Sequence, residues 1–207
     1  MTNFKEIVER VLSNYPKPKL ELDFKSPYEL LVGLVLSARC RDSLTNRITK
    51  DFFKKYPTPK EMSEASTEDI NEMIASCSMH NTKAKNLKKI AEILCEKYSC
   101  EVPSSFEKLV SLPGVADKTA NMVLSFGFGI PAIGVDTHVL RVANRVGISS
   151  SNKAKQVEED IKKICPKDKW IAFYSGLILL GRYVCKAKSP MCGSCFLNDI
   201  CPKRGLK

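Results

Sequence analysis

The sequence predicts an all-α fold, and three observations support this. Apolar residues recur at helical spacing along almost the whole chain. The strict alternation typical of strands and the Asn-Gly or Asp-Gly dipeptides typical of hairpins are missing. Two stretches, residues 30–35 and 170–180, are too apolar for surface helices, so we expect them to be central.

Individual helices can be placed from their apolar stripes and their caps. The clearest is expected over residues 83–95. Its apolar stripe consists of Ala84, Leu87, Ile90, Ala91 and Leu94. A shorter helix is expected to follow over residues 104–110, because Ser104 and Glu107 fit a capping box that would open it.

Domain boundaries are only weakly marked. The chain of 207 residues is long enough for one large domain or two small ones. The best candidate breaks are Pro16–Lys19 and Gly127–Pro131, because proline and glycine interrupt helices there. No segment has the uninterrupted apolar length that a membrane span needs. Met1–Arg10 is polar and charged, so we expect no signal peptide and an intracellular, reducing setting.

The balance of charge points to an anionic partner. Lysine and arginine number 33 against 23 aspartates and glutamates, which leaves a net charge of +10. Nucleic acid is the commonest partner of so basic a chain. A basic surface that serves only solubility is the alternative on charge alone.

Four cysteines near the C-terminus are expected to form a metal centre. Within 17 residues they are separated by six, two and five others, and they are Cys185, Cys192, Cys195 and Cys201. This compact run favours a [4Fe–4S] cluster. Zinc remains open, although its sites more often consist of two Cys-x-x-Cys pairs held apart. The remaining cysteines show no clustering, so we expect buried free thiols at Cys40, Cys77, Cys95, Cys100 and Cys165.

The segment Leu112–Lys118, Leu-Pro-Gly-Val-Ala-Asp-Lys, is expected to be a hairpin between two helices. Pro113 ends the first helix and Gly114 permits a tight turn. The second helix is expected over residues 118–126, with Gly127 as its stop. A turn that leads into a helix N-terminus presents unpaired N–H groups, which suit a DNA phosphate. A Pro-Gly turn also occurs in many helical hairpins that bind nothing.

Two side chains beside these turns are candidates for chemistry. Lys118 is either a solvated cation near phosphate or an amine nucleophile that forms a Schiff base with a sugar. Asp136, in Val135–His138, is expected to cap a helix that runs through Val146. Capping does not exclude a second role, in which its carboxylate stabilises positive charge on a sugar or acts as a base. His138 is expected to be structural.

Taken together, these segments resemble a known family. Leu112–Ala120, Val135–His138 and the four-cysteine run are similar, in the same order, to segments of the endonuclease III family of helix-hairpin-helix DNA glycosylases. Leu36-Ser37-Ala38 and Asn81–Ala84 are similar to further segments of that family. The resemblance covers nearly the whole chain.

The resemblance implies two helical domains flanking a DNA-binding cleft. Residues 20–130 would form a six-helix domain with the helix-hairpin-helix, and residues 1–19 with 131–207 would carry the [4Fe–4S] cluster. The cysteine run would supply the cluster's ligands. Lys118 would be the nucleophile and Asp136 the essential aspartate.

The resemblance also implies an activity. The family removes oxidised pyrimidines by Schiff-base chemistry and nicks the abasic site by β-elimination. We therefore expect a monomeric enzyme that acts on double-stranded DNA with damaged bases or abasic sites, in the cytoplasm at the nucleoid.

Other expected DNA contacts include departures from the family pattern. Arg39 stands where the family commonly has glutamine, and its guanidinium could occupy the space left by a flipped base. Met79 and His80 stand where Leu-Tyr is usual, and Met79 can still act as an apolar wedge. Ala116 replaces the second glycine of the hairpin, which we expect to worsen the phosphate turn slightly. The remaining expected contacts are Leu112, Gly114 and Val115 in the hairpin and Lys186 and Lys188 in the cysteine loop.

Two rival functions remain. One is a mismatch-specific monofunctional glycosylase, which generally lacks a lysine at the position of Lys118. The other is a non-catalytic iron–sulfur protein that binds DNA. Binding alone does not require both Lys118 and Asp136, so the pair argues against it.

Overall fold

The computed structural model describes residues 3–16 and 18–206, and these form helices joined by loops, with no strand in the described part. The prediction of an all-α fold is confirmed. Residues 1, 2 and 17, which belong to the segments 1–10 and 16–19 discussed above, lie outside the described residues. The chain divides into two compact units, residues 20–130 (the central unit) and residues 1–19 with 131–207 (the terminal unit).

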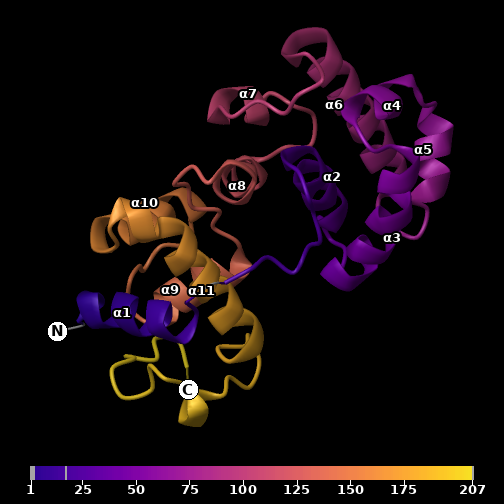
Figure 1. Ribbon diagram of the computed structural model, residues 1–207. Helices are drawn as coiled ribbons and strands as arrows, with labels where there is room; N and C mark the ends of the chain where they lie inside the picture. Colours follow the sequence, from indigo (N-terminus) through magenta and orange to yellow (C-terminus); the bar gives the residue numbers. More distant parts are fainter. Residues whose placement is uncertain (1–2, 17, 207) are drawn as a thin grey trace. The chain divides into compact units, whose positions relative to one another are not determined.

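The central unit contains the helices from α2 to η1 (Figure 1). They are α2 (Pro27–Ser37), α3 (Asp42–Lys55), α4 (Pro59–Glu64), α5 (Thr67–Met73), α6 (His80–Tyr98), α7 (Phe106–Val110), α8 (Asp117–Met122) and the π-helical turn η1 (Val123–Gly127). The terminal unit contains α1 (Phe4–Asn14), α9 (Thr137–Arg145), α10 (Ala154–Ile164), η2 (Lys167–Lys169), α11 (Trp170–Tyr183) and η3 (Cys192–Ser194).

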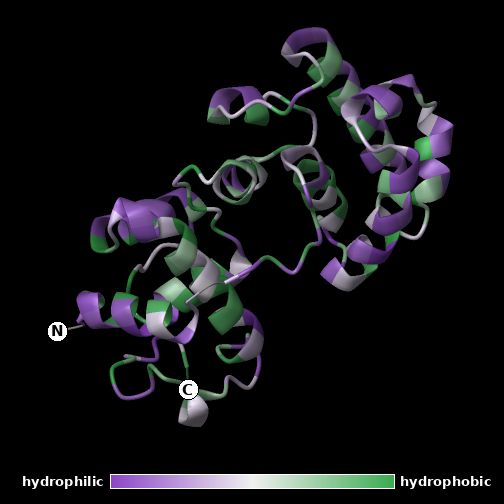
Figure 2. Cartoon of the chain, viewed as in Figure 1, coloured by the Kyte–Doolittle hydropathy of each residue, from purple (hydrophilic) through white to green (hydrophobic). Residues whose placement is uncertain are grey.

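Helix α2 lies at the core of the central unit, as its apolar sequence predicts. Leu30, Leu31 and Leu36 have no exposed surface. Helices α3, α6 and α8 pack around it, and Figure 2 shows its hydrophobic colour. Ser26 begins the helix by accepting a hydrogen bond from the N–H of Glu29. That side chain satisfies one of the backbone donors that a helix start leaves unpaired.

Helix α6 confirms the expected apolar stripe. All five of its predicted residues are fully buried, namely Ala84, Leu87, Ile90, Ala91 and Leu94. They pack against α4, α5 and α2. Lys83, one turn before Leu87, is also buried on this face, and a buried lysine is uncommon unless its charge has partners.

The expectation of a free thiol is wrong at Cys95 and Cys100, which form a disulfide. Their Cα atoms lie 3.8 Å apart. Ser99 and Cys100 both adopt left-handed backbone conformations, with φ of 53° and 59°. These two residues turn the chain back along the end of α6 and bring the two sulfur atoms together. Cys77 and Cys165 are buried free thiols as expected, while Cys40 is free but only half-buried.

Two predicted helix ends differ from the observed ones. Ser105, not Ser104, caps α7, because its Oγ accepts from the N–H of Lys108. The helix predicted over residues 118–126 begins at Asp117 and changes to π-helical bonding at Val123. Such a wider turn is not visible in the spacing of apolar residues.

The terminal unit is built around α11. Phe173, Tyr174 and Leu177 have no exposed surface, and α1, α9 and η2 pack against this helix. The apolar character of residues 170–180 therefore predicted a central helix correctly. Arg10 of α1 donates to the carbonyl of Phe196, at 2.9 Å, and pairs with Asp199, which ties α1 to the cysteine loop.

No helix among the described residues is long and apolar enough to cross a lipid bilayer.

We expect Gly176→Ala to destabilise the protein. A Cβ atom at this position of α11 would lie 2.6 Å from Cγ1 of Val11 in α1. Overpacking of this kind typically costs about 1–3 kcal/mol in the free energy of unfolding, which denaturant unfolding measures. The control is Gly33→Ala in α2, where the nearest atom would be Cδ1 of Leu22 at 3.8 Å. Equal stability of the two variants would contradict the prediction.

Candidate functional site

The hairpin before α8 is held by two buried side chains and one glycine. Leu112 and Val115 are 2% and 6% exposed, and the N–H of Val115 donates to the carbonyl of Leu112. Gly114 between them is exposed at φ +77°, and a Cβ there would lie 2.5 Å from Nδ2 of Asn86. Only glycine fits this turn without strain. Ala116 has φ −88°, which any residue adopts, so the alanine causes no backbone strain in the hairpin. Its expected effect on the phosphate turn stays a prediction.

Because Leu112 and Val115 are buried, their side chains shape the hairpin from inside. Their N–H groups are also occupied, because they donate to the carbonyls of Leu109 and Leu112, so Gly114 is the exposed residue of the turn. The first turn of α8 directly follows the hairpin. Its N-cap residue, Ala116, supplies no side-chain hydrogen bond to the N–H groups of that turn. Lys118 is the second residue of α8 and is exposed.

Asp136 caps α9 as the sequence predicts. Its Oδ1 accepts from the N–H groups of His138 and Val139, each at 2.8 Å. The carboxylate is half-buried. Lys118 belongs to the central unit and Asp136 to the terminal unit.

His138 has the structural surroundings that its helical setting predicts. Its Nδ1 lies 3.1 Å from Nη2 of Arg141, and because a guanidinium only donates, the ring nitrogen accepts. The same guanidinium nitrogen donates to the carbonyl of Gly181 in α11 at 2.7 Å. His138 therefore helps to join α9 to α11.

Two arginines of α9 hold the loop that begins with Cys185. Arg141 donates to the carbonyl of Cys185 at 3.0 Å. Arg145 donates to the carbonyls of Lys186 and Ala187 at 2.6 and 3.1 Å, and lies 3.5 Å from Sγ of Cys185. Neither arginine was expected from the sequence to belong to this site. Their only signal in the sequence is their spacing, because residues four apart lie on the same face of a helix, here its polar face.

The two expected phosphate contacts of this loop, Lys186 and Lys188, are exposed. Arg145 binds the carbonyl of Lys186 through Nη1. The backbone that carries these lysines is therefore fixed while their side chains reach solvent.

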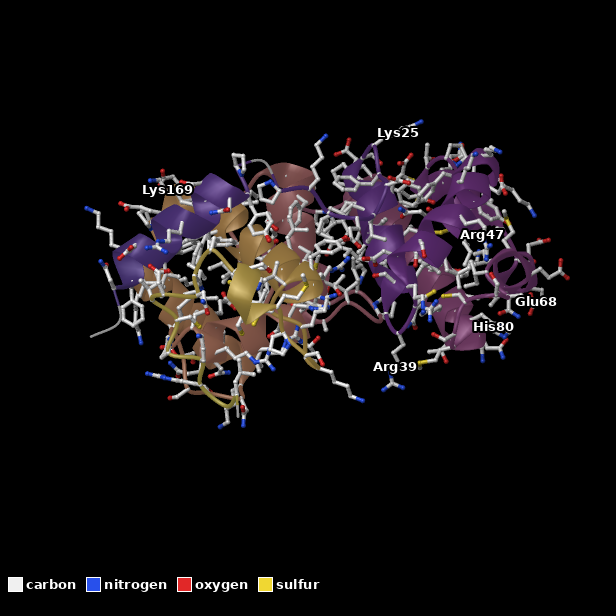
Figure 3. All side chains as sticks on the ribbon, turned by 90° about the horizontal axis from the view of Figure 1, so that it is seen from below. Lys25, Arg39, Arg47, Glu68, His80 and Lys169 are labelled. Atoms are coloured by element: carbon white, nitrogen blue, oxygen red, sulfur yellow. A yellow bond between two sulfur atoms is a disulfide. The ribbon has the colours of Figure 1, made fainter. Side chains whose placement is uncertain are left out.

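Arg39 and Met79 lie on two loops that touch. The loop after α2 carries Arg39, and the loop before α6 carries Met79. Oγ of Ser78 donates to the carbonyl of Arg39 at 2.7 Å. Arg39 and Met79 are both exposed and both left-handed, with φ of 56° and 58°. Figure 3 shows the Arg39 side chain extending away from the ribbon. His80 is instead half-buried and bonded to Oδ1 of Asn71 at 2.7 Å.

The four clustered cysteines line one pocket together with apolar side chains. All four are free and half-buried, and they are Cys185, Cys192, Cys195 and Cys201. The apolar lining includes Leu180, Val184, Met191 and Leu197. No group of three or more His, Cys, Asp or Glu side chains in the described chain forms a ready ligand set for a single metal ion.

The chemistry of this pocket fits an iron–sulfur cluster. The backbone N–H groups of Leu197 and Lys203 point at Sγ of Cys195 and Cys201, at 3.5 and 3.4 Å. Burial raises the pKa of both thiols, and repulsion from the neighbouring cysteines raises it further. A bound iron centre reverses that balance, because a metal's positive charge stabilises coordinated thiolates.

Comparison with known proteins identifies the family. A sequence model of the HhH-GPD superfamily of base excision DNA repair proteins matches residues 32–167. The chain belongs to this superfamily. A model of the iron–sulfur binding domain of endonuclease III matches residues 185–201, and the cofactor of the chain is a [4Fe–4S] cluster.

Similar sequences and structures agree with this assignment. The chain is 41% identical to endonuclease III of Bacillus subtilis over 205 residues, which covers 97% of this chain and 94% of that protein. It is also 41% identical to endonuclease III of Escherichia coli strain K12, over 95% of this chain and 93% of that one. The structure of a trapped covalent intermediate of endonuclease III with DNA has a TM-score of 0.92 and 40% identity, covering 98% and 97% of the two chains.

A structure of a thermostable thymine-DNA glycosylase is also similar. Its TM-score is 0.88 and its identity 25%, over 97% of this chain and 95% of that one.

We expect anaerobically purified protein to be yellow-brown and to contain about four irons per chain, as a [4Fe–4S] cluster requires. Cys192→Ala removes a thiol of the pocket and is expected to lower the iron content and the visible absorbance. Cys40→Ala, which removes a free thiol outside the pocket, is expected to leave both unchanged. Stoichiometric zinc in a colourless sample would contradict the prediction.

Proposed function

We propose that this HhH-GPD protein is a bifunctional DNA glycosylase and abasic-site lyase that removes oxidised pyrimidines in base excision repair. The observation that carries the proposal is the likeness to endonuclease III in a covalent intermediate with DNA. A covalent intermediate requires a nucleophile on the protein. Lys118, exposed in the first turn of α8 directly after the hairpin, supplies an amine suited to that role.

Base flipping is the first step of the proposed reaction. A damaged base stacks and pairs less well, so moving it out of the duplex costs less than moving a normal base. Met79 acts as an apolar wedge in the stack, and Arg39 donates hydrogen bonds to the base left without a partner. Both side chains are exposed and available for such contacts.

Lys118 then performs both chemical steps. In its uncharged form, Nζ attacks C1′, the N–C1′ bond forms, and the glycosidic bond breaks as the base leaves with a proton. Ring opening leaves an imine between lysine and sugar. The imine acidifies the hydrogens on C2′, and loss of one of them breaks the bond between C3′ and its phosphate oxygen.

Asp136 stabilises charge during these steps. Its carboxylate offsets the positive charge that develops on the sugar and can accept a proton from the lysine. Because its Oδ1 accepts two backbone N–H groups, the carboxylate is held in one orientation. A cap and a catalytic group are therefore combined in one residue.

The cluster organises the loop that meets DNA. The four clustered cysteines hold the [4Fe–4S] cluster, which supplies structural cross-linking when bound. Lys186 and Lys188 then contact phosphate, as does the backbone N–H group of Gly114, the exposed residue of the hairpin. His80 contributes by its bond to Asn71, which steadies the residue next to Met79.

The setting of the reaction follows from its substrate. The protein acts as a monomer on double-stranded DNA with damaged bases or abasic sites, in the cytoplasm at the nucleoid. A net charge of +10 supports association with DNA.

A mismatch-specific monofunctional glycosylase is the second candidate, because a thymine-DNA glycosylase structure is similar over most of both chains. The higher identity to endonuclease III, 41% against 25%, favours the bifunctional enzyme. Lys118 favours it as well, since a monofunctional enzyme needs no imine.

We expect borohydride to trap the wild-type protein covalently on duplex DNA with an abasic site, because the reagent reduces the imine formed by Lys118. Lys118→Gln should give no adduct and lose at least a thousandfold in strand nicking, since no amine remains to form the intermediate. Gel electrophoresis of trapped complexes measures the outcome. Lys108→Gln, which alters an exposed lysine in the preceding helix, should trap like wild type. An undiminished adduct with Lys118→Gln would exclude Lys118 as the nucleophile.

We expect Lys186→Ala with Lys188→Ala to weaken DNA binding on all sequences alike. Each lost phosphate contact should reduce the slope of log K against log salt by about 0.9. Titrations at several salt concentrations measure this slope. Lys54→Ala with Lys55→Ala, on α3, serves as the charge-matched control, and a slope unchanged from wild type in the loop variant would remove these lysines from the interface.

A further inference from the structure

Lys83 is a buried lysine whose partners are backbone carbonyls and a thiol. It lies in the first turn of α6 and is 5% exposed. Its Nζ donates to the carbonyls of Leu36 and Ala38, each at 2.7 Å, and to Sγ of Cys77 at 3.1 Å. An ammonium group has three N–H donors, so these acceptors account for all three. None of them is a carboxylate.

The acceptors come from the end of α2, where the loop with Arg39 begins, and from the loop before α6. Leu36 and Ala38 belong to the end of α2, where carbonyls lack helical partners and carry partial negative charge. Cys77 belongs to the loop before α6, and its thiol donates in turn to the carbonyl of Leu36 at 3.2 Å. Burial raises the pKa of the Cys77 thiol, which keeps it protonated for this bond. Lys83 therefore fastens the two loops to each other.

The same two loops carry the exposed pair Arg39 and Met79. Arg39 directly follows Ala38, and Met79 is two residues after Cys77. Both residues have left-handed backbones, a conformation that disfavours side chains other than glycine and persists only when the surroundings impose it. The bonds of Lys83, with the bond from Ser78 to the carbonyl of Arg39, supply these surroundings.

We propose that Lys83 is a positioning residue that holds Arg39 and Met79 at a fixed spacing. The apolar wedge, Met79, and the guanidinium that bonds to the unpaired base, Arg39, then enter opened DNA together. The inference rests on the proposed function, because it takes both side chains as DNA contacts. A buried cation makes the connection between these two loops stiff. Three charge-assisted bonds to two loops leave little freedom between them, whereas an apolar contact is non-directional.

The first test reads the position of the side chains in DNA. A duplex carries a non-cleavable tetrahydrofuran abasic analogue opposite 2-aminopurine, and fluorescence is measured at saturating protein, so that affinity does not enter. We expect Lys83→Met to reduce the fluorescence change at least twofold. A full wild-type change would overturn the proposal.

Lys88→Met is the matched control for this test. Lys88 lies on the same helix, is half-buried, and donates to the carbonyl of Ser63, far from the two loops in sequence. Like Lys83→Met, this variant loses a lysine that donates to a backbone carbonyl, but Lys88 does not bond to the loops that carry Arg39 and Met79. It should give the wild-type fluorescence change. A loss equal to that of Lys83→Met would assign the effect to general destabilisation and overturn the proposal.

The second test is a double-mutant cycle with Met79→Ala. Single-turnover release of an oxidised pyrimidine should be ten- to a hundredfold slower in Lys83→Met, about the loss that misplacement by an ångström causes. In the Met79→Ala background the same substitution should slow release by a clearly smaller factor, because one of the two residues that Lys83 positions is gone. An equal loss in both backgrounds would show that Lys83 acts on stability alone and would overturn the proposal.

Folding and the proposed function are tested separately. If Lys83→Met does not fold, Cys77→Ala removes one of the three acceptors and should show the same coupling to Met79→Ala at smaller magnitude. Additive effects there would overturn the proposal. Borohydride trapping of wild type distinguishes the other failure, because no adduct would refute the lyase function, whereas trapping with an additive cycle would refute only the role of Lys83.

Discussion

Each compact unit depends on one helix that is apolar on nearly every side. Helix α2 has this place in the central unit and α11 in the terminal unit, and each is surrounded by amphipathic helices. Such a helix has no polar face to present to water, so its burial determines which neighbours must cover it. The ends of these two helices then become starting points for functional loops, because Arg39 follows α2 and Cys185 follows α11.

Both loops are held by cations that donate to backbone carbonyls. Lys83 binds the carbonyls of Leu36 and Ala38 at the end of α2. Arg141 and Arg145 bind carbonyls of the cysteine loop after α11. Lys83 thereby satisfies carbonyls at the end of a helix, whereas the two arginines satisfy carbonyls of the loop itself. A loop held in this way keeps a defined backbone while its side chains remain exposed for DNA.

Much of the fold and site could be predicted from the sequence because the signals are local. The apolar stripe of α6, the cap at Asp136 and the cysteine run each depend on spacing within a few residues. The failures share a different cause. The disulfide between Cys95 and Cys100 accompanies a turn in which Ser99 and Cys100 are both left-handed. Spacing contains no information about such backbone conformations.

The sequence by itself determined the helical class, the two central apolar helices, the buried stripe of α6 and the residue types available for metal binding and imine chemistry. These follow from periodicity and chemical identity, which folding does not alter. Only the tertiary structure decided which polar groups meet. Lys83 is one charged residue among many in the sequence, and its role became visible when α6 brought it against the end of α2. The carbonyls of Leu36 and Ala38 lie 47 and 45 residues away from Lys83 in the chain, and packing alone brings them to it.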